Sequence, residues 1–227
     1  MDSIMTLNIG DGAIGRCFRD VEGIRLPEGI ALVMPCQTHT ANVEVVTDSS
    51  QTFPETDALI TQLPGVAVGV RTADCVPILL YAPDIMAVAA VHAGWKGTVG
   101  NIVGNTIDRL VSLGADVNGI RAAFGPSICG ECYETGPELA EKFKAADLAD
   151  AVIYGYGTDP LGEGRFDEST VRIDLRKANT LLMTREGIPA TNITHSTECT
   201  RHSPLHWPSW RRETGTSSRL ATVIHLI

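Results

Sequence analysis

Residues 71–77 read Arg71-Thr72-Ala73-Asp74-Cys75-Val76-Pro77, and residues 91–97 read Val91-His92-Ala93-Gly94-Trp95-Lys96-Gly97. Each stretch lies at the end of a short apolar run and then turns through small or rigid residues. Short apolar runs bounded by Pro, Gly and Asp are typical of buried β-strands. The two stretches therefore indicate a sheet whose strand ends carry polar side chains.

The chain around these stretches is dense with predicted strands. Six apolar runs are separated by Pro, Gly, Asp and Ser: Ile30–Met34, Val43–Thr47, Ala58–Thr61, Val66–Val70, Pro77–Tyr81 and Met86–His92. Later patterns predict helices over 102–111, 139–148 and 175–186, and strands over 120–124, 151–154, 171–174, 192–195 and 219–226. Because the strands cluster instead of alternating with helices, the sequence predicts one α+β domain over residues 1–227 with mixed sheets.

The composition is that of a globular protein and excludes several function classes. Of the 227 residues, 44% are apolar and 20% are charged, and the formal net charge is -9. Nucleic-acid binding requires a basic surface that neutralises phosphates. Because this chain is acidic, no nucleic-acid partner is expected. No run is apolar and long enough to span a bilayer, and residues 1–5 lack the basic start of a secretory signal. The six cysteines do not form a disulfide-scaffold pattern, so we expect free thiols in a reducing cytoplasm.

Three predicted strand ends carry side chains that bind transition metals. His39 follows the run Ile30–Met34, Cys75 follows Val66–Val70, and His92 closes a third run. Two imidazoles and one thiolate make a three-ligand site with an open fourth position, the arrangement of a catalytic zinc. A single His or Cys at a strand end is more often structural. The shared placement of all three is what indicates one metal site.

Neighbouring residues indicate how such a site would treat a substrate. Asp74 precedes a sharp turn, from which its carboxylate and the Cys75 thiol can reach one cavity. Arg71 and Lys96 add positive charge for a small anion, with solvated surface charges as the alternative interpretation. Thr98 is a candidate cap for the following helix, whose N-terminus would favour phosphate.

Other Cys and His residues support different interpretations. Cys129-Gly130-Glu131-Cys132 is a CxxC motif, but the chain has no second CxxC to complete a structural zinc site and no thioredoxin-like context for a redox pair. His202 and His206 are four residues apart, but Pro204 between them excludes the regular helix of a zincin. A Cys–His hydrolase with Cys75 as nucleophile is an alternative that needs no metal.

Several segments together resemble the YfiH family, also called the laccase-domain or multicopper polyphenol oxidase family. The matching segments are Gln37–His39, Thr56–Thr61, Arg71–Leu80, Ala89–Thr98, Gly125–Ile128, Cys132–Glu134, Cys199–Thr200 and Ser209–Arg212. The combination of Thr72-Ala73-Asp74-Cys75 with His92-Ala93-Gly94-Trp95 is the most specific part. The chain departs from the family in lacking a Gly-Gly element before residue 7 and in having Ser218 where the family has Gly.

The resemblance implies a layered α/β/β/α fold with mixed sheets and zinc bound by His39, Cys75 and His92. It also implies phosphorolysis of the purine nucleosides adenosine, inosine and methylthioadenosine, and deamination of adenosine. The matching segments offer Gln37 and Arg211 as substrate or phosphate ligands. A His2Cys site also suits blue copper, but six histidines are too few for the copper clusters of a laccase.

The sequence therefore predicts a zinc-dependent purine nucleoside phosphorylase with adenosine deaminase activity. Asp74 is the candidate proton carrier, Cys75 and His92 lie at the reacting centre, and Arg71 and Lys96 are candidates for holding phosphate. A copper-dependent polyphenol oxidase and a non-catalytic metal-binding protein are the alternatives. The preferred nucleoside and the oligomeric state are left open.

Overall fold

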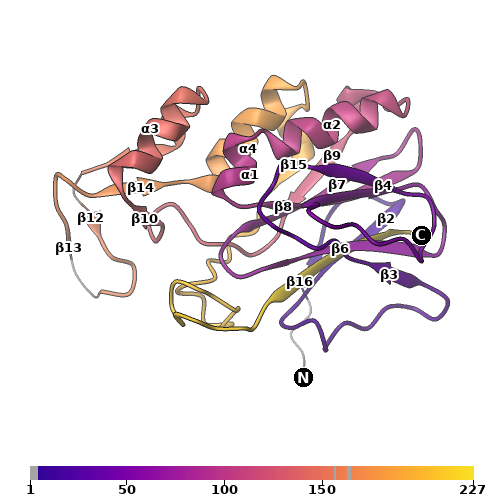
Figure 1. Cartoon of the computed structure of the whole chain (residues 1–227), viewed down its shortest axis with the longest axis horizontal. Coiled ribbons are helices and arrows are strands. Elements are labelled where there is room, and N and C mark those ends of the chain that lie inside the picture. The colour runs from indigo at the N-terminus through magenta and orange to yellow at the C-terminus, as the bar shows by residue number, and fades with distance from the viewer. Residues whose placement is uncertain (1–4, 156, 163–164) are drawn as a thin grey trace.

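Four helices lie along one side of two stacked sheets in the computed structural model, which describes residues 5–155, 157–162 and 165–227 (Figure 1). The helices are α1 (Trp95–Val99), α2 (Ile102–Ser112), α3 (Pro137–Ala145) and α4 (Leu175–Arg185), and single 3-10 turns occupy Val117–Gly119, Ala149–Ala151 and Ala190–Asn192. The α+β class and the mixed sheets predicted from the sequence are confirmed.

The sheet next to the helices has six strands in the order β15-β9-β7-β8-β5-β4. In that order the strands are Ile193–Thr194, Arg121–Phe124, Val76–Ala82, Ala87–Ala93, Ala58–Thr61 and Val43–Val46. Strands β7 and β8 are buried along their whole length, because helices cover one face and the second sheet covers the other. Strands buried on both faces read as continuous apolar runs, which is why both were evident in the sequence.

Strand β7 divides its side chains between two cores. Ile78 and Leu80 pack into the core that contains helix α2, whereas Leu79 and Tyr81 pack into the core between the two sheets. A shift by one residue would exchange these two sets, so the register of β7 is strongly specified. Cys75, immediately before the strand, is thereby held at a defined position.

The second sheet has five strands in the order β1-β2-β16-β6-β3. In that order they are Met5–Leu7, Ala13–Phe18, Leu220–Leu226, Val66–Thr72 and Ala31–Val33. The sequence analysis did not predict β1 or β2, since Gly15 and Arg16 interrupt the apolar pattern of β2. Gly15 lies where the sheets approach each other: a Cβ there would be 2.7 Å from Cδ1 of Leu79.

The outer face of the five-stranded sheet differs from the predicted α/β/β/α layering, because no helix covers it among the described residues. Phe18, Ala67, Ala221 and Val223 on this face are covered by apolar side chains from the segment 21–34, which contains no helix. The helices of the described residues lie on the opposite side (Figure 1). The turns and loop that precede β3 therefore take the place of an outer helical layer.

Two small sheets extend to one side together with α3 (Figure 1). One pairs β10 (Glu134–Thr135), β14 (Val171–Ile173) and β11 (Val152–Tyr154), and the other pairs β12 (Gly157–Thr158) with β13 (Arg165–Phe166). Among the described residues, no helix has the length and apolar character needed to cross a membrane. Residues 1–4, on which the secretory-signal expectation partly rests, lie outside the described residues.

Candidate metal centre and active site

His39, Cys75 and His92 converge on one point in the folded chain. Each offers one ligand atom, and these atoms lie within 4.8 Å of one another. The imidazole rings of His39 and His92 meet edge to face, with their centroids 4.8 Å apart. The structure thus brings together the three ligands that the sequence proposed.

The placement of these residues only partly follows the strand-end prediction. Cys75 does lie in the tight connection between β6 and β7. His92 is the penultimate residue of β8, also as predicted, whereas His39 lies in a loop well beyond the end of β3 at Val33, with a φ of 64°. A strand end alone therefore does not position His39, and another group must hold its loop.

That group is Asp57, a fully buried carboxylate immediately before β5. It accepts hydrogen bonds from the backbone N–H groups of Thr38 (3.2 Å), His39 (3.1 Å) and Thr40 (2.7 Å), and from the Thr40 hydroxyl (2.8 Å). Its Oδ1 also lies 2.6 Å from Nδ1 of His92. One carboxylate therefore positions two of the three candidate ligands.

The contact with Asp57 also determines which nitrogen of His92 is available to a metal. Because Nδ1 faces the carboxylate, Nε2 is left for the ion. A carboxylate on the far nitrogen is the usual outer partner of a metal-binding imidazole. The sequence analysis gave Asp57 no role; its segment was noted only as part of the family resemblance.

The charges of the cluster favour a thiolate at Cys75. Burial alone would raise the pKa of Cys75, but the charge of His92 and hydrogen bonds from both imidazoles outweigh it and lower the pKa to about 6. Burial alone would lower the pKa of His92, but the Cys75 thiolate and Asp57 raise it to about 9. Burial of Asp57 is likewise outweighed by hydrogen bonds from His92 and Thr40, which lower the pKa of that carboxyl. Between these two values the metal-free cluster is a thiolate–imidazolium pair.

Gly94 leaves the space that the cluster occupies. Its backbone angles (φ -75°, ψ 173°) suit any residue, so conformational freedom is not the reason for a glycine here. A Cβ at this position would lie 2.9 Å from Sγ of Cys75 and 3.2 Å from Cδ2 of His39. The donor set, the carboxylate behind His92 and this cleared space together fit a transition-metal ion.

The cluster forms part of the wall of a cavity of about 690 Å³. Every predicted site residue except Lys96 lines it: Gln37, His39, Arg71, Asp74, Cys75, His92 and Arg211. The wall also includes four large side chains to which the sequence analysis gave no role: Trp95, Tyr133, Trp210 and Arg219. Although the chain is acidic as a whole, this cavity carries three guanidinium groups and three aromatic rings.

Asp74 ties the cavity wall to the C-terminal loop. Its Oδ1 accepts a hydrogen bond from the Thr200 hydroxyl at 2.6 Å, and its Oδ2 accepts one from the backbone N–H of Arg211 at 2.7 Å. Its backbone carbonyl accepts a third from the N–H of Ile128 at 3.0 Å. The carboxylate both lines the cavity and holds the loop that closes one side of it.

Gln37 and Lys96 are placed differently from the other predicted ligands. The Gln37 amide pairs with the backbone N–H and carbonyl of Arg71, each at 2.8 Å, and so supports that strand end. The ammonium of Lys96 lies 5.7 Å from the ring centroid of Trp95, a residue of the wall. Lys96 therefore contacts a residue of the wall but does not itself line the cavity.

The prediction that Thr98 caps the following helix was wrong. Helix α1 already begins at Trp95 after Gly94, so Thr98 lies within it, and α2 begins after Asn101. The Thr98 hydroxyl instead accepts a hydrogen bond from the Asn179 side chain at 2.9 Å. The error arose because the short α1 has too few residues to show helical periodicity.

Residues 18–227 match the family model described as multi-copper polyphenol oxidoreductase laccase. The chain belongs to this family. It is 39% identical over 205 residues to an adenosine deaminase, RL5, from an unknown prokaryotic organism, covering 86% of this chain and 74% of the relative. It is 40% identical over 184 residues to a purine nucleoside phosphorylase of Deinococcus radiodurans, covering 81% of this chain and 66% of the relative.

Solved structures agree with this assignment. The Bacillus licheniformis protein YfiH matches 87% of this chain and 74% of its own with a TM-score of 0.78 and 28% identity. A Neisseria meningitidis protein matches 98% of both chains with a TM-score of 0.80, and at 23% identity it shows the fold alone. The relatives that match over most of the chain are named as enzymes, so the chain is a member of a family of enzymes, as the sequence predicted.

The lowered pKa of Cys75 predicts an unusual pH profile of thiol reactivity. In metal-free protein, the rate of alkylation of Cys75 by iodoacetamide should rise as the pH increases through about 6, because the thiolate is the reactive form. Peptide mass spectrometry can follow this site separately, with the exposed Cys36 as internal reference. A midpoint near ~8.5, the value of an unperturbed thiol, would contradict the described electrostatics.

Replacing Asp57 by Asn should weaken metal binding without removing a ligand. Loss of such outer carboxylates typically lowers metal affinity about 10–100-fold. Competition between the protein and a chromogenic chelator, with Zn²⁺ as probe, measures this change. Glu55→Gln removes an exposed carboxyl two positions away and should leave affinity unchanged; equal affinities in the two variants would show that Asp57 does not position the ligands.

Gly94→Ala should disturb the cluster through contact alone. The added Cβ would overlap Sγ of Cys75, and overpacking of this kind costs about 1–3 kcal/mol. That energy corresponds to a fall in Zn²⁺ affinity of roughly one to two factors of ten. Gly119→Ala is the matched control, since a Cβ there meets nothing within 4 Å. Unchanged affinity in Gly94→Ala would mean that the cluster does not hold the ion in the described geometry.

Proposed function

We propose that the chain is a zinc-dependent purine nucleoside phosphorylase that also deaminates adenosine. The observation that carries this proposal is the cluster of His39, Cys75 and His92 at the wall of a cavity lined by aromatic rings and arginines. The names of the relatives from Deinococcus radiodurans and the unknown prokaryote support the two activities.

The cavity suits both halves of a nucleoside reaction. Its volume of about 690 Å³ lies within the ~300–1,000 Å³ typical of small-molecule sites. Trp95, Tyr133 and Trp210 supply flat apolar surfaces on which a purine ring can pack. Arg71, Arg211 and Arg219 supply guanidinium groups, whose planar donors match the oxygens of phosphate.

Zinc is the proposed ion, and it would be held by Nε2 of His92, an imidazole nitrogen of His39 and Sγ of Cys75. A zinc ion with three protein ligands and an open position supplies Lewis-acid activation of water or substrate. The thiolate state of Cys75 at neutral pH prepares the site, because a thiol must lose its proton before it can bind the ion.

Asp74 is the candidate proton carrier on the cavity wall. Hydrogen bonds from Thr200 and Arg211 fix its carboxylate in place, and each oxygen keeps a further lone pair that can accept another hydrogen bond. In deamination it would accept a proton from the attacking water and pass it to the departing amine. In phosphorolysis the same carboxyl, when protonated, would donate to the leaving purine.

The anion would be held by the arginines of the cavity wall rather than by the full set of ligands that the sequence proposed. Arg71 and Arg211, both proposed from the sequence, stay candidates because they line the cavity, and Arg219 joins them from the C-terminal loop. Gln37 acts as a positioning residue through the backbone of Arg71. Lys96, beside Trp95, would contribute its charge without lining the cavity. The six free cysteines are consistent with a reducing compartment, and we propose the cytoplasm.

Cys75→Ala should abolish both activities, because it removes a metal ligand from the reacting centre. Purified protein is incubated with adenosine and phosphate, and products are separated by chromatography. The native protein should form inosine by deamination and adenine with ribose 1-phosphate by phosphorolysis; inosine and methylthioadenosine are tested in parallel. Cys36→Ala, at an exposed cysteine outside the cavity wall, is the matched control and should keep full activity.

The alternatives predict different results when metal content, phenol oxidation and the effect of a chelator are measured alongside the nucleoside assay. A copper phenol oxidase would contain copper with a visible thiolate-to-copper band and would oxidise phenols. A non-catalytic protein would bind zinc without consuming nucleoside. A Cys–His hydrolase would keep its activity after metal removal by a chelator. Any of these outcomes, or full activity in Cys75→Ala, would overturn the proposed function.

A further inference from the structure

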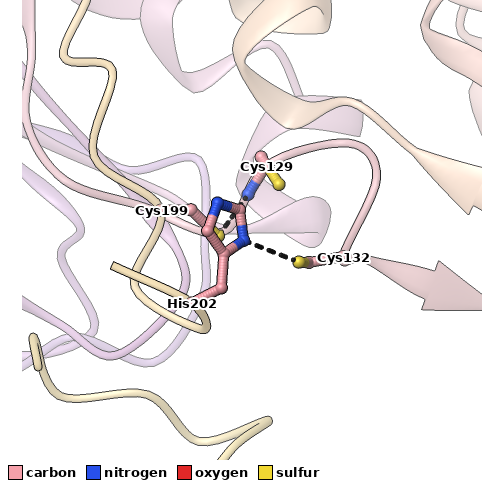
Figure 2. A group of neighbouring side chains, drawn as sticks. All are labelled: Cys129, Cys132, Cys199 and His202. Carbon is pink, nitrogen blue, oxygen red and sulfur yellow. Dashed lines mark hydrogen bonds between the residues drawn. The ribbon is translucent and has the colours of Figure 1, made fainter. Parts of the chain in front are cut away.

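A second group of possible ligands lies apart from the first and shares no residue with it. Figure 2 shows this group, Cys129, Cys132, Cys199 and His202, with the four side chains directed toward a common point. Their ligand atoms all lie within 4.8 Å of one another. The proposed nucleoside chemistry uses none of these residues.

The spacing of the four residues is that of two chelating pairs. Cys129 and Cys132 form a CxxC, and Cys199 with His202 forms a CxxH. The CxxH is the second pair of a four-ligand site, and the sequence analysis missed it because it considered only a second CxxC. Each pair encloses a tight turn: the N–H of Cys132 donates to the carbonyl of Cys129 at 3.1 Å, and the N–H of Ser203 donates to that of Cys199 at 2.9 Å. Such turns place both side chains of a pair on the same side.

Backbone contacts hold the two turns against each other. Ser127 and Cys199 form an isolated parallel bridge, and the N–H of Thr200 donates to the carbonyl of Ser127 at 3.1 Å. Arg176 of helix α4 donates from Nε to the Ser127 hydroxyl at 2.7 Å and from a terminal nitrogen to the carbonyl of Ser196 at 2.9 Å. The cluster is therefore built on a fixed frame, and its geometry does not depend on side-chain contacts alone.

The surroundings of the sulfur atoms also suit an ion. Cys132 and Cys199 are 1% and 2% exposed, whereas His202 reaches the surface and offers a route of entry. Nδ1 of His202 lies 3.2 Å from Sγ of Cys132, and the N–H of Cys129 donates to Sγ of Cys199 at 3.4 Å. A backbone N–H directed at a sulfur stabilises the thiolate that a metal requires.

We propose that Cys129, Cys132, Cys199 and His202 bind a zinc ion in a closed structural site. Three thiolates and one imidazole form a Cys3His tetrahedron, one of the common structural zinc arrangements. With Zn–S bonds of about 2.3 Å, tetrahedral geometry places the sulfur atoms ~3.8 Å apart, so only small closing movements are needed. Four protein ligands leave no open position, in contrast to the cluster at the cavity.

The ion would fasten together two segments that form the cavity wall. The CxxC turn leads directly into Tyr133, and the CxxH turn contains Thr200, which binds Asp74. The loop after His202 continues to Trp210 and Arg211, two further wall residues. Because a closed metal site cross-links distant parts of the chain, its loss should loosen this side of the cavity first.

The zinc content of purified variants tests the proposal. Native protein should contain about two zinc ions per chain, Cys199→Ser about one, Cys75→Ala about one, and the double variant none. Cys36→Ser, at an exposed cysteine outside both clusters, should keep two and serves as the matched control. The second site does not depend on the proposed enzymatic activity, so a catalytically inactive native protein with two zinc ions would leave this inference intact.

Cobalt substitution distinguishes the two sites without relying on activity. In Cys75→Ala, bound Co²⁺ should show the intense thiolate charge-transfer bands and tetrahedral d–d bands of a three-sulfur site. Cys199→Ser should keep only the weaker band of the single Cys75 sulfur. His202→Ala changes an exposed side chain and so tests the site without removing buried sulfur; it should release its ion to a chelator faster than the native protein.

Three results would overturn the proposal. The first is a native zinc content equal to that of Cys199→Ser. The second is a disulfide among Cys129, Cys132 and Cys199 in protein purified under reducing conditions, detected as a mass lower by two hydrogens in a non-reduced peptide. The third is a His202→Ala variant that releases metal at the native rate while Cys75→Ala shows no cobalt charge-transfer band.

Discussion

The candidate centre depends on one buried charge, the carboxylate of Asp57. An unpaired carboxylate in a protein interior costs several kcal/mol, so its burial is tolerated only because every direction around it supplies a donor. The donors are the backbone of the loop 38–40, the Thr40 hydroxyl and Nδ1 of His92. Satisfying this single charge therefore forces the His39 loop and the His92 ring into the positions from which both can bind a metal.

A second carboxylate, Asp74, does for the C-terminal loop what Asp57 does for the His39 loop. It joins the β6–β7 connection to Thr200 and Arg211, residues more than a hundred positions later in the chain. This link brings guanidinium groups and aromatic rings to a cavity that is also lined by the ends of β6 and β8. The local charge of the site thus differs from the acidic charge of the chain, because folding selects which side chains meet.

The two ligand clusters illustrate how similar donors acquire different roles. At the cavity wall, two imidazoles and one thiolate would hold an ion with three protein ligands and so would leave it a fourth position for water or substrate. In the proposed second site, three thiolates and one imidazole occupy all four positions, and two tight turns fill the surroundings. The number of protein ligands and the access of solvent decide between chemistry and cross-linking.

The sequence by itself determined the parts of this protein that have a local cause. Strands β7 and β8 could be predicted because burial on both faces makes them continuously apolar. His39, Cys75 and His92 could be proposed as ligands because their side chains are of types that bind metals. Only the tertiary structure decided the role of Asp57, the membership of β2 in the second sheet, the pairing of the CxxC with the CxxH, and the aromatic wall. Each of these depends on contacts between residues far apart in the chain, which no local pattern of hydrophobicity or spacing records.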